Sequence, residues 1–526
     1  MRRRGGTALA VTLSIGLFPH CDNVSPAETA TAEAVAAPRF ERSGTRLEAR
    51  GWEADGFFVF DTFFDTKLGI ECVPGIASDN VRRCLPRNVY RKLPKIGSTP
   101  PQYFEAPDCK DGRLIEVWKG EGRCTDPARI VAVGFGSASD YERIGEPRTP
   151  ASELNTIYSG KSCSETIAPP EYEFFAPGAP IAATDLVAFT VREVDVAPGL
   201  RALVLDGEDG SRYPQGDFVN VARGQPCHLG LAADDVKRCV PSAGSYRSSE
   251  AFVDEACTSH AAIPLNELPR DDGSACTLGP CDDRAVTTGA WPSAANPCAE
   301  KVAYHERGPE RPIVRYTRAG SAPCEPASSD SDQGFSSFAI GEEIDPKTLP
   351  KATDGVTTHA RLEERTVIVG GVSVQRVSIV DPTLDDEECT FVTAADGKPR
   401  CLPVNGLLAQ RPHPNRSLSP LYYEDEGCTQ RLYFPPTDPG EYYFPFGART
   451  QCGREARFAH VVEGSPCAPV VRIHDVRPAT AAFTKDDAGR CVTASGVLDG
   501  ELKGSVFALA DEVPAARFAE GTAVTR

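Results

Sequence analysis

Short runs of β-branched and aromatic residues recur along the chain, each bounded by Gly, Pro, Asp or Ser. The clearest are GFFVFD (56–61), RIVAVG (129–134), LVAFTV (186–191), PIVRY (312–316), RTVIVGGVSV (365–374) and RFAHVV (457–462). Runs of this length and composition predict β-strands. The 46 Gly and 45 Pro interrupt the chain too often for long helices, although a helical turn is expected at PASELNTIYS (150–159). The pattern predicts an all-β, mainly antiparallel protein.

One pattern occurs three times: two cysteines with eleven residues between them, an Asp seven places after the first, and a Pro two places after the second. The cysteine pairs are Cys72 and Cys84, Cys227 and Cys239, and Cys389 and Cys401. The Asp-Asn, Asp-Asp and Asp-Gly dipeptides at 79–80, 234–235 and 396–397 tolerate left-handed backbone. Each copy therefore predicts a β-hairpin, and we interpret Asp79, Asp234 and Asp396 as caps of its turn.

The turn geometry decides whether a hairpin can hold its own disulfide. A two-residue turn at Asp79-Asn80 would offset Cys72 from Cys84 by three residues, about 10 Å along a strand. A disulfide allows a Cα separation of roughly 7 Å at most. A bridge within the hairpin therefore needs a wider loop, centred on Ser78 or on its counterparts Ala233 and Ala395. The identical spacing favours this loop, which makes the six hairpin cysteines our disulfide candidates.

The repeat extends beyond the hairpins. An aromatic residue stands five places before a further cysteine in each copy, at Phe104, Phe252 and Tyr423. The closing segments FFAPGAPIAATDLVAFT, SFAIGEEIDPKTLPKAT and VFALADEVPAARFAEGT align without a gap on Phe175, Phe338 and Phe507, and RLEAR (46–50), RALVL (201–205) and RLEER (361–365) lie upstream. We expect three disulfide-braced modules of about 155–165 residues, at 46–194, 195–357 and 358–526. They form either a propeller-like disc, which would hide sheet edges, or beads on a string.

The N-terminus predicts export. Arg2, Arg3 and Arg4 precede an apolar stretch at 7–18 that is too short to span a bilayer. We expect a signal peptide at 1–20 and a flexible tether at 21–45, with Cys21 as the lipidated first residue. The alternative is cleavage within the Ala-rich stretch, which would discard Cys21. The protein is thus expected in the cell envelope, held to the membrane only through this anchor, or fully secreted.

Cysteine content and charge support this location. Nineteen cysteines indicate an oxidising compartment, and 18 remain without Cys21, an even number suited to disulfides. Five fall in the first module, seven in the second and six in the third, so full pairing requires at least one bridge between the first two. The net charge of -18 argues against nucleic acid as a partner and fits a solvated surface.

No motif in the chain predicts catalysis, a cofactor or a metal site. HExxH, GxSxG, phosphate-loop and dinucleotide signatures are missing, and no histidine recurs at an equivalent position. We interpret Cys276 and Cys281 as disulfide cysteines before zinc ligands, and the acidic loops at 206–210 and 330–334 as turns before calcium sites. Aromatic residues that could stack on sugars, or equally fill a core, are Trp52, Trp118, Trp291, Tyr422, Tyr423, Tyr442 and Tyr443.

The repeated motifs resemble a family of exported proteins and predicted lipoproteins of myxobacteria, built on a module of the form Cys…AADG-x-x-RCLP…YF-x-D-x-x-C. The third copy is the nearest, with AADG at 394–397 and RCLP at 400–403, whereas the first departs furthest, with ASDN at 77–80. The resemblance covers nearly all of the chain after the tether. It implies an exported location and a repeated architecture, and it implies no activity.

Two hypotheses for function follow. The first is a cell-envelope β-repeat lipoprotein with a structural or binding role, which recognises an extracellular protein or a glycan and does no chemistry. The alternative is an extracellular hydrolase with its site at a junction between modules, where pockets often form. A cluster of His with Asp or Glu in one cleft of the structure would favour the second hypothesis, and the absence of any such cluster would exclude it.

Overall fold

The structure, a computed structural model, describes residues 41–87, 89–91, 103–104, 108–109, 113–118, 130–133, 140–148, 156–159, 163–167, 172–252, 256–258, 260–264, 282–289, 302–311, 316–317, 324–326, 337–404, 406–408, 422–433, 457–465, 468–486, 488–494 and 506–526. These residues form β-strands joined by turns and short 3₁₀ segments. Nearly all strand pairs are antiparallel, so the predicted fold class is confirmed.

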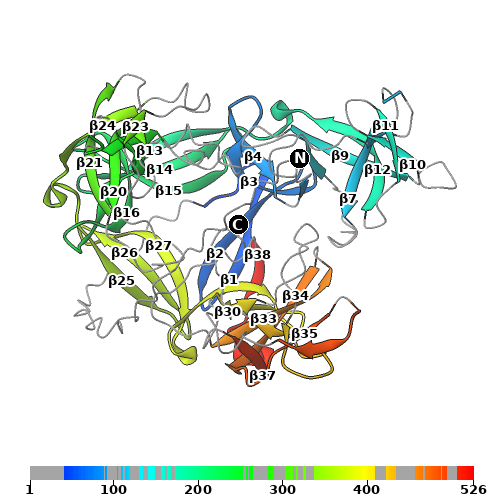
Figure 1. Ribbon diagram of the computed structural model, residues 1–526. Helices are drawn as coiled ribbons and strands as arrows, with labels where there is room; N and C mark the ends of the chain where they lie inside the picture. The colour runs from blue at the N-terminus through cyan, green and yellow to red at the C-terminus, as the bar shows by residue number, and fades with distance from the viewer. Residues whose placement is uncertain are drawn as a thin grey trace, which may run out of the picture.

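Three five-stranded sheets share one strand order, and we call them the first, second and third meander sheets (Figure 1). The first contains β1 (Leu47–Ala54), β2 (Phe57–Asp65), β3 (Ile70–Ile76), β4 (Arg82–Pro86) and β38 (Thr522–Thr525). The second contains β13 (Phe189–Ala197), β14 (Leu200–Gly207), β15 (Arg212–Asn220), β16 (Gln225–Leu231) and β17 (Lys237–Pro241). The third contains β25 (Ala352–Thr358), β26 (Glu363–Val369), β27 (Val372–Asp381), β28 (Glu387–Thr393) and β29 (Pro399–Pro403).

The edge strand of each meander sheet continues from a closing segment, and in the second and third sheets this segment directly precedes the sheet in the chain. β13 pairs with β14 and β25 pairs with β26, so the expected module boundaries at 194/195 and 357/358 fall inside these two strands. In the first meander sheet β38 takes the same place, with Arg50 opposite Thr525 and Glu53 opposite Thr522. The last strand of the chain thus joins the first meander sheet.

The three meander sheets pack on one another in a cycle. The cysteine core of the first sheet receives Phe189 and Leu205 of the second. The core of the second receives Val367 and Val374 of the third, and the core of the third receives Phe57 of the first. Each interface joins one end of a sheet to the opposite end of the next sheet. The third interface brings the third sheet back to the first, so the three sheets form a closed ring.

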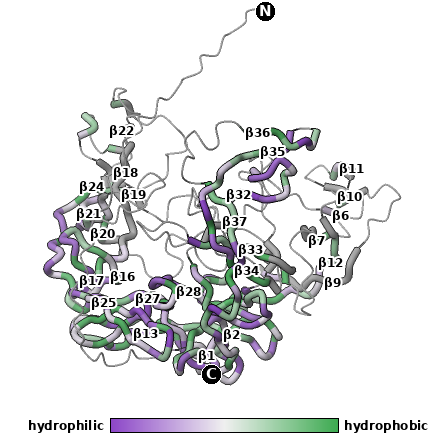
Figure 2. The backbone as a smooth tube through the Cα atoms, turned by 90° about the horizontal axis from the view of Figure 1, so that it is seen from below, coloured by the Kyte–Doolittle hydropathy of each residue, from purple (hydrophilic) through white to green (hydrophobic). Residues whose placement is uncertain are grey.

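Alternation along the strands provides these cores. β1 has the burial pattern BiBiBieB, in which every second residue faces the core over most of its length. Figure 2 shows hydrophobic and hydrophilic positions mixed along β1, β2 and β13. Leu47 and Leu200 are the first residues of β1 and β14, Leu362 directly precedes β26, and all three are completely buried.

Outer sheets lie at the periphery of the molecule (Figure 1). One contains β5 (Val89–Arg91), β6 (Tyr103–Phe104), β7 (Arg113–Trp118), β8 (Ile130–Val133), β9 (Asp140–Arg148), β10 (Thr156–Ser159), β11 (Ser164–Ile167) and β12 (Tyr172–Ile181). Another contains β18 (Ala243–Phe252), β19 (His260–Pro264), β20 (Asp282–Gly289), β21 (Val302–Arg311), β22 (Tyr316–Thr317), β23 (Glu325–Pro326) and β24 (Ser337–Glu343). The last region contains β30 (Gly406–Leu408), β32 (Leu432–Tyr433), β33 (Phe458–Ser465), β34 (Ala468–Pro478) and β37 (Phe507–Val513), with a small sheet of β31 (Tyr422–Tyr423), β35 (Phe483–Lys485) and β36 (Cys491–Thr493).

The aligned closing segments have the same local structure. After β12, β24 and β37 the chain makes the 3₁₀ turns η3 (Ala183–Asp185), η6 (Pro346–Thr348) and η8 (Ala515–Arg517). The next residue is buried in each case, at Leu186, Leu349 and Phe518. These segments lead from each outer sheet back to the meander sheets.

Two local predictions were wrong. RTVIVGGVSV is a hairpin and not one strand, because Gly370 and Gly371 have φ of +59° and +85° and separate β26 from β27. The helical turn expected at 150–159 is the strand β10 where it is described, paired with β6 and β11. Within the described ranges, no helix is long and apolar enough to cross a bilayer.

Candidate functional site

Each cysteine hairpin closes through a tight loop capped by its Asp. In the first, the Ala77 backbone N–H donates to the Val81 carbonyl at 3.0 Å, and Asn80 has a left-handed φ of +59°. Asp79 Oδ1 accepts the Val81 N–H at 3.1 Å, and Asp234 and Asp396 make the corresponding bonds. The interpretation of these residues as turn caps is confirmed.

The hairpin disulfides Cys72–Cys84, Cys227–Cys239 and Cys389–Cys401 are present, with Cα separations of 5.2, 5.3 and 5.1 Å. The expected loop centre was wrong by one residue. Cys72 lies opposite Pro86 and Cys84 lies opposite Pro74, which centres the loop on Asp79 and not on Ser78. The bridge therefore runs diagonally across the pair, along the diagonal that strand twist shortens.

The Arg before the second cysteine joins the hairpin to the closing segment. Arg83 donates to both Asp79 and the Leu186 carbonyl, at 2.7 and 2.8 Å. Arg238 and Arg400 make equivalent bonds to the carbonyls of Leu349 and Phe518. These three Asp–Arg pairs are the polar constellation that recurs in all copies, and all three hold backbone in place.

The guanidinium groups also fix the ionisation of their partners. The hydrogen bond from Arg83 lowers the pKa of Asp79 from its ordinary value, and the bond from Arg238 does the same for Asp234. For Asp396, burial acts to raise the pKa, and the bonds from Arg400 and Lys398 outweigh it and lower the pKa. The three carboxylates therefore stay charged and bonded at neutral pH.

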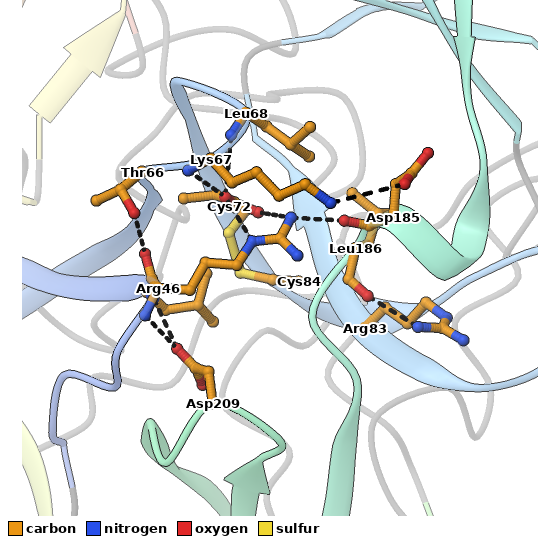
Figure 3. Close-up of polar contacts among 12 residues, drawn as sticks. Arg46, Thr66, Lys67, Leu68, Cys72, Arg83, Cys84, Asp185, Leu186 and Asp209 are labelled. Atoms are coloured by element: carbon orange, nitrogen blue, oxygen red, sulfur yellow. Dashed lines mark hydrogen bonds and ion pairs between the residues drawn. A yellow bond between two sulfur atoms is a disulfide. The ribbon is translucent and has the colours of Figure 1, made fainter.

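A second Arg holds the corner between β2 and β3 (Figure 3). The buried carboxylate of Asp65 accepts two bonds from Arg46, at 2.8 and 2.6 Å, and Arg46 also donates to the Asp185 carbonyl at 2.5 Å. Across the interface, Asp209 of the second meander sheet accepts the backbone N–H groups of Arg46 and Leu47. One corner thus connects the first sheet, its closing segment and the second sheet.

Three longer disulfides brace the outer sheets. They are Cys109–Cys163, Cys257–Cys324 and Cys428–Cys491, with sequence separations of 54 to 67. The remaining cysteines, Cys21, Cys124, Cys276, Cys281, Cys298, Cys452 and Cys467, lie outside the described residues, as does the bridge expected between the first two modules. The six disulfides are consistent with an oxidising environment outside the cytosol.

A histidine–carboxylate pair lies at the junction of the first and third meander sheets. His359 Nε2 is 3.0 Å from Glu364 Oε2, and its ring stacks on Phe57 of the first sheet with centroids 4.3 Å apart. Arg376 donates to Glu364 Oε1 at 2.6 Å and to the Phe58 carbonyl at 2.9 Å. The pair supplies part of what the hydrolase hypothesis requires, which is a cluster of His with Asp or Glu in one cleft.

The surroundings of this pair limit its chemistry. Glu364 orients the imidazole, as a carboxylate orients the base of a hydrolytic triad. In the described part of the chain, no hydroxyl or thiol donates to the other ring nitrogen of His359. Glu364 is also committed to Arg376, and the stacked imidazole fills the interface. Glu364 therefore orients His359 as it would orient a general base, but the network acts as a contact between the two sheets.

One other histidine is a core residue. Burial lowers the pKa of His460 to about 4, although the Pro403 carbonyl acts in the opposite direction. His460 is therefore neutral at physiological pH and belongs to the packing of its sheet. His228, by contrast, has an exposed side chain on β16.

The other sequence candidates do not form one site. Trp52 packs against the core of the third meander sheet, and Tyr423 is buried, which supports their interpretation as core residues. The side chains of the remaining aromatic candidates, apart from half-buried Tyr422, lie outside the described set, as does the loop at 330–334. Within the loop at 206–210, Asp206 bonds Arg192 and Arg212. No group of three metal-ligating side chains occurs among the described residues.

The recurring Asp–Arg pairs were identifiable from their spacing, whereas the His359 network was not. His359 and Glu364 are five residues apart on the two sides of a turn, and neither has an equivalent in the other copies. Comparison with known proteins adds no further candidate, because no protein-family model, curated protein or solved structure matches the chain.

Proposed function

We propose that the chain is a non-catalytic, exported scaffold of three repeated modules that binds an extracellular protein or glycan. The observation that carries this proposal is the structural role of the recurring polar residues. In all three Asp–Arg pairs the Arg donates to a backbone carbonyl of a closing segment. The cyclic packing of the meander sheets gives a rigid core. The outer sheets, which differ in sequence between the modules, then form the binding surfaces on this rigid core.

The proposed location is the cell envelope, with Cys21 as a lipid anchor. The disulfides support export, and the N-terminal pattern of basic residues, apolar stretch and cysteine supports lipidation. The same features fit the exported myxobacterial family that the motifs resemble. Metabolic labelling with a fatty-acid analogue should mark the wild-type chain, and Cys21→Ala should remove both the label and membrane retention. Unlabelled wild-type chain in the medium would instead support full secretion.

Binding is tested with the oxidised chain on glycan arrays and in capture from envelope extracts. We expect one class of glycan or one extracellular protein to bind saturably at micromolar concentration. The matched control is the reduced and alkylated chain, in which the hairpin bridges are open and binding should disappear. Equal binding by the reduced chain, or no partner at these concentrations, would count against the scaffold.

The junction of the first and third meander sheets favours a second candidate, a hydrolase that uses His359 as a general base. Its observation is the 3.0 Å contact between His359 and Glu364. A panel of chromogenic ester, glycoside and peptide substrates tests it, with His359→Gln as the variant and His474→Gln, on the half-buried histidine of β34, as the control. Turnover that only His359→Gln abolishes would replace the scaffold proposal, and no turnover would leave the pair as an inter-sheet contact.

A further inference from the structure

The three meander sheets differ in how they protect their open edges. In each sheet the edge at the second cysteine strand contacts a closing segment, through the bridges Arg83–Ala188, Arg238–Lys351 and Arg400–Glu520. The opposite edges are formed by β38, β13 and β25. An unpaired edge exposes backbone N–H and C=O groups that can pair with another strand.

Two of these edges carry protection. β13 has exposed charges in ion pairs with its own sheet, Arg192 with Asp206 and Glu193 and Asp195 with Arg201. β38 has only four residues, and the following Arg526 places its guanidinium 4.6 Å from the centre of the Phe58 ring. Charge and short length are two of the devices by which proteins keep edges from pairing.

β25 is less protected than either. It is seven residues long, ATDGVTT, and all but Ala352 and Gly355 are exposed. Its one charge, Asp354, is bonded to Lys237 of the second meander sheet. Val356 is 47% exposed, among the most exposed large apolar residues that the structure describes. Beyond Lys351, no described strand pairs with the outer edge of β25.

Gly355 leaves the face of β25 open to side chains of the neighbouring strand. A side chain at Gly355 would meet the Ile368 side chain at 2.5 Å and the Thr366 hydroxyl at 3.0 Å. The Ile368 side chain therefore covers the backbone of β25 and extends the apolar surface toward the edge. Thr, Val and Gly along the strand leave room for a second strand on the same plane.

From this edge we infer that the chain forms a two-fold dimer in which β25 pairs antiparallel with β25 of a second copy. In an antiparallel pair with its two-fold axis normal to the sheet, one residue must lie opposite itself. Centring the pair on Val356 sets this valine against its copy, Asp354 against Thr358, and Gly355 against Thr357. No like charges meet, and the carboxylate faces a hydroxyl donor.

The same operation is more restricted for β13. Centring it on Arg192 or Glu193 would place that charge against its own copy, which destabilises a strand pair. Centring it on Val191 avoids this, so variants at Val191 and Val356 decide between the two edges. β25 carries one charge, whereas β13 carries three. This dimer contact lies apart from the outer sheets that the scaffold proposal assigns to other partners, so either can fail alone.

Sedimentation velocity of the purified chain tests the dimer over a range of concentrations. We expect a monomer–dimer equilibrium in the micromolar range for the wild type, weakened about tenfold or more by Val356→Lys, which sets like charges opposite each other. Val191→Lys is the matched control, since Val191 is 48% exposed on β13, and it should leave the equilibrium unchanged. Circular dichroism should show both variants folded. A monomeric wild type at 100-fold higher concentration, or equal weakening by the two variants, would overturn the inference.

A cross-link gives a second readout. Residues opposite each other in an antiparallel pair have Cα atoms about 4.5–5.5 Å apart, within reach of a disulfide. Val356→Cys should therefore form a covalent dimer on mild oxidation, visible on a non-reducing gel, and Val191→Cys should not. Equal cross-linking of the two variants would contradict the proposed register. Pairing of β25 only with a foreign chain would also contradict the second-copy assignment.

Discussion

Two equivalent corners, between β2 and β3 in the first meander sheet and between β15 and β16 in the second, each bury a polar side chain. They differ in whether that side chain is charged. Asp65 lies opposite Leu47 and Asn220 lies opposite Leu200, at the ends of β2 and β15. Both are almost completely buried. Asp65 is bonded to Arg46, whereas Gly199 stands where the second sheet would have that Arg.

The backbone bonds of the two corners are alike. Asp65 Oδ1 accepts the N–H groups of Lys67 and Leu68, and Asn220 Oδ1 accepts those of Ala222 and Arg223. The third sheet follows the first, with Asp381 bonded to Arg361. The side-chain oxygen is thus the shared requirement. A negative charge is present only where an Arg neutralises it, since an unpaired buried carboxylate is costly.

Removing the Arg should give the largest effect. Arg46→Ala leaves the buried Asp65 carboxylate without its guanidinium and should lower the free energy of unfolding by about 3–5 kcal/mol. Chemical denaturation followed by tryptophan fluorescence measures the loss. The double variant Arg46→Gly/Asp65→Asn reproduces the second corner and should recover most of it. A double variant as unstable as Arg46→Ala would show that the charge is irrelevant.

The converse change tests the second sheet. Asn220→Asp buries a carboxylate with no Arg beside it and should destabilise the fold by about 2–4 kcal/mol at neutral pH. The loss should shrink at acidic pH, where the carboxyl group is neutral. Adding Gly199→Arg should restore part of the stability. If Asn220→Asp does not lower the free energy of unfolding at pH 7, the difference in charge between the two corners has no energetic basis.

Sequence patterns anticipated the hairpins because their signals are local. Left-handed residues after Asp79, Asp234 and Asp396, with cysteines at fixed spacing, determine both the turn and the bridge. The loop centre was missed by one residue since the diagonal disulfide depends on strand twist, which no spacing records.

The corners could not be aligned from the sequence. Matching letters placed Arg201 with Arg46 and Arg361, yet strand register makes Gly199 the counterpart of Arg46. The junction pair His359 and Glu364 was also missed, because its setting depends on Phe57 from another sheet, about 300 residues away in the chain. Register and inter-sheet packing are tertiary properties.

A local effect should distinguish the closing segments. Arg46 holds the Asp185 carbonyl and Arg361 holds that of Arg517, whereas Gly199 offers nothing to the equivalent Thr348. A charged hydrogen bond contributes about 1.5–3 kcal/mol, which corresponds to roughly 10–100-fold in local opening. Hydrogen exchange should therefore be faster at the amides of Thr348 and Leu349 than at residues 185–186 or 517–518. Equal protection in the three segments would show that these bonds do not limit opening.

The smallest effect concerns the hairpin Asp–Arg pairs, in which the three sheets should behave alike. The pKa values of Asp79, Asp234 and Asp396 are lowered from 3.8. A carboxylate with a depressed folded-state pKa stabilises the fold above its unfolded pKa and loses this contribution as the pH falls through the folded value. Wild-type stability should therefore decline below about pH 4, as each pair is protonated. Denaturation midpoints of Asp79→Asn, Asp234→Asn and Asp396→Asn should each fall slightly at pH 7 and approach the wild type in acid. A loss confined to one sheet would show that, unlike the corners, equivalent hairpins are not energetically equivalent.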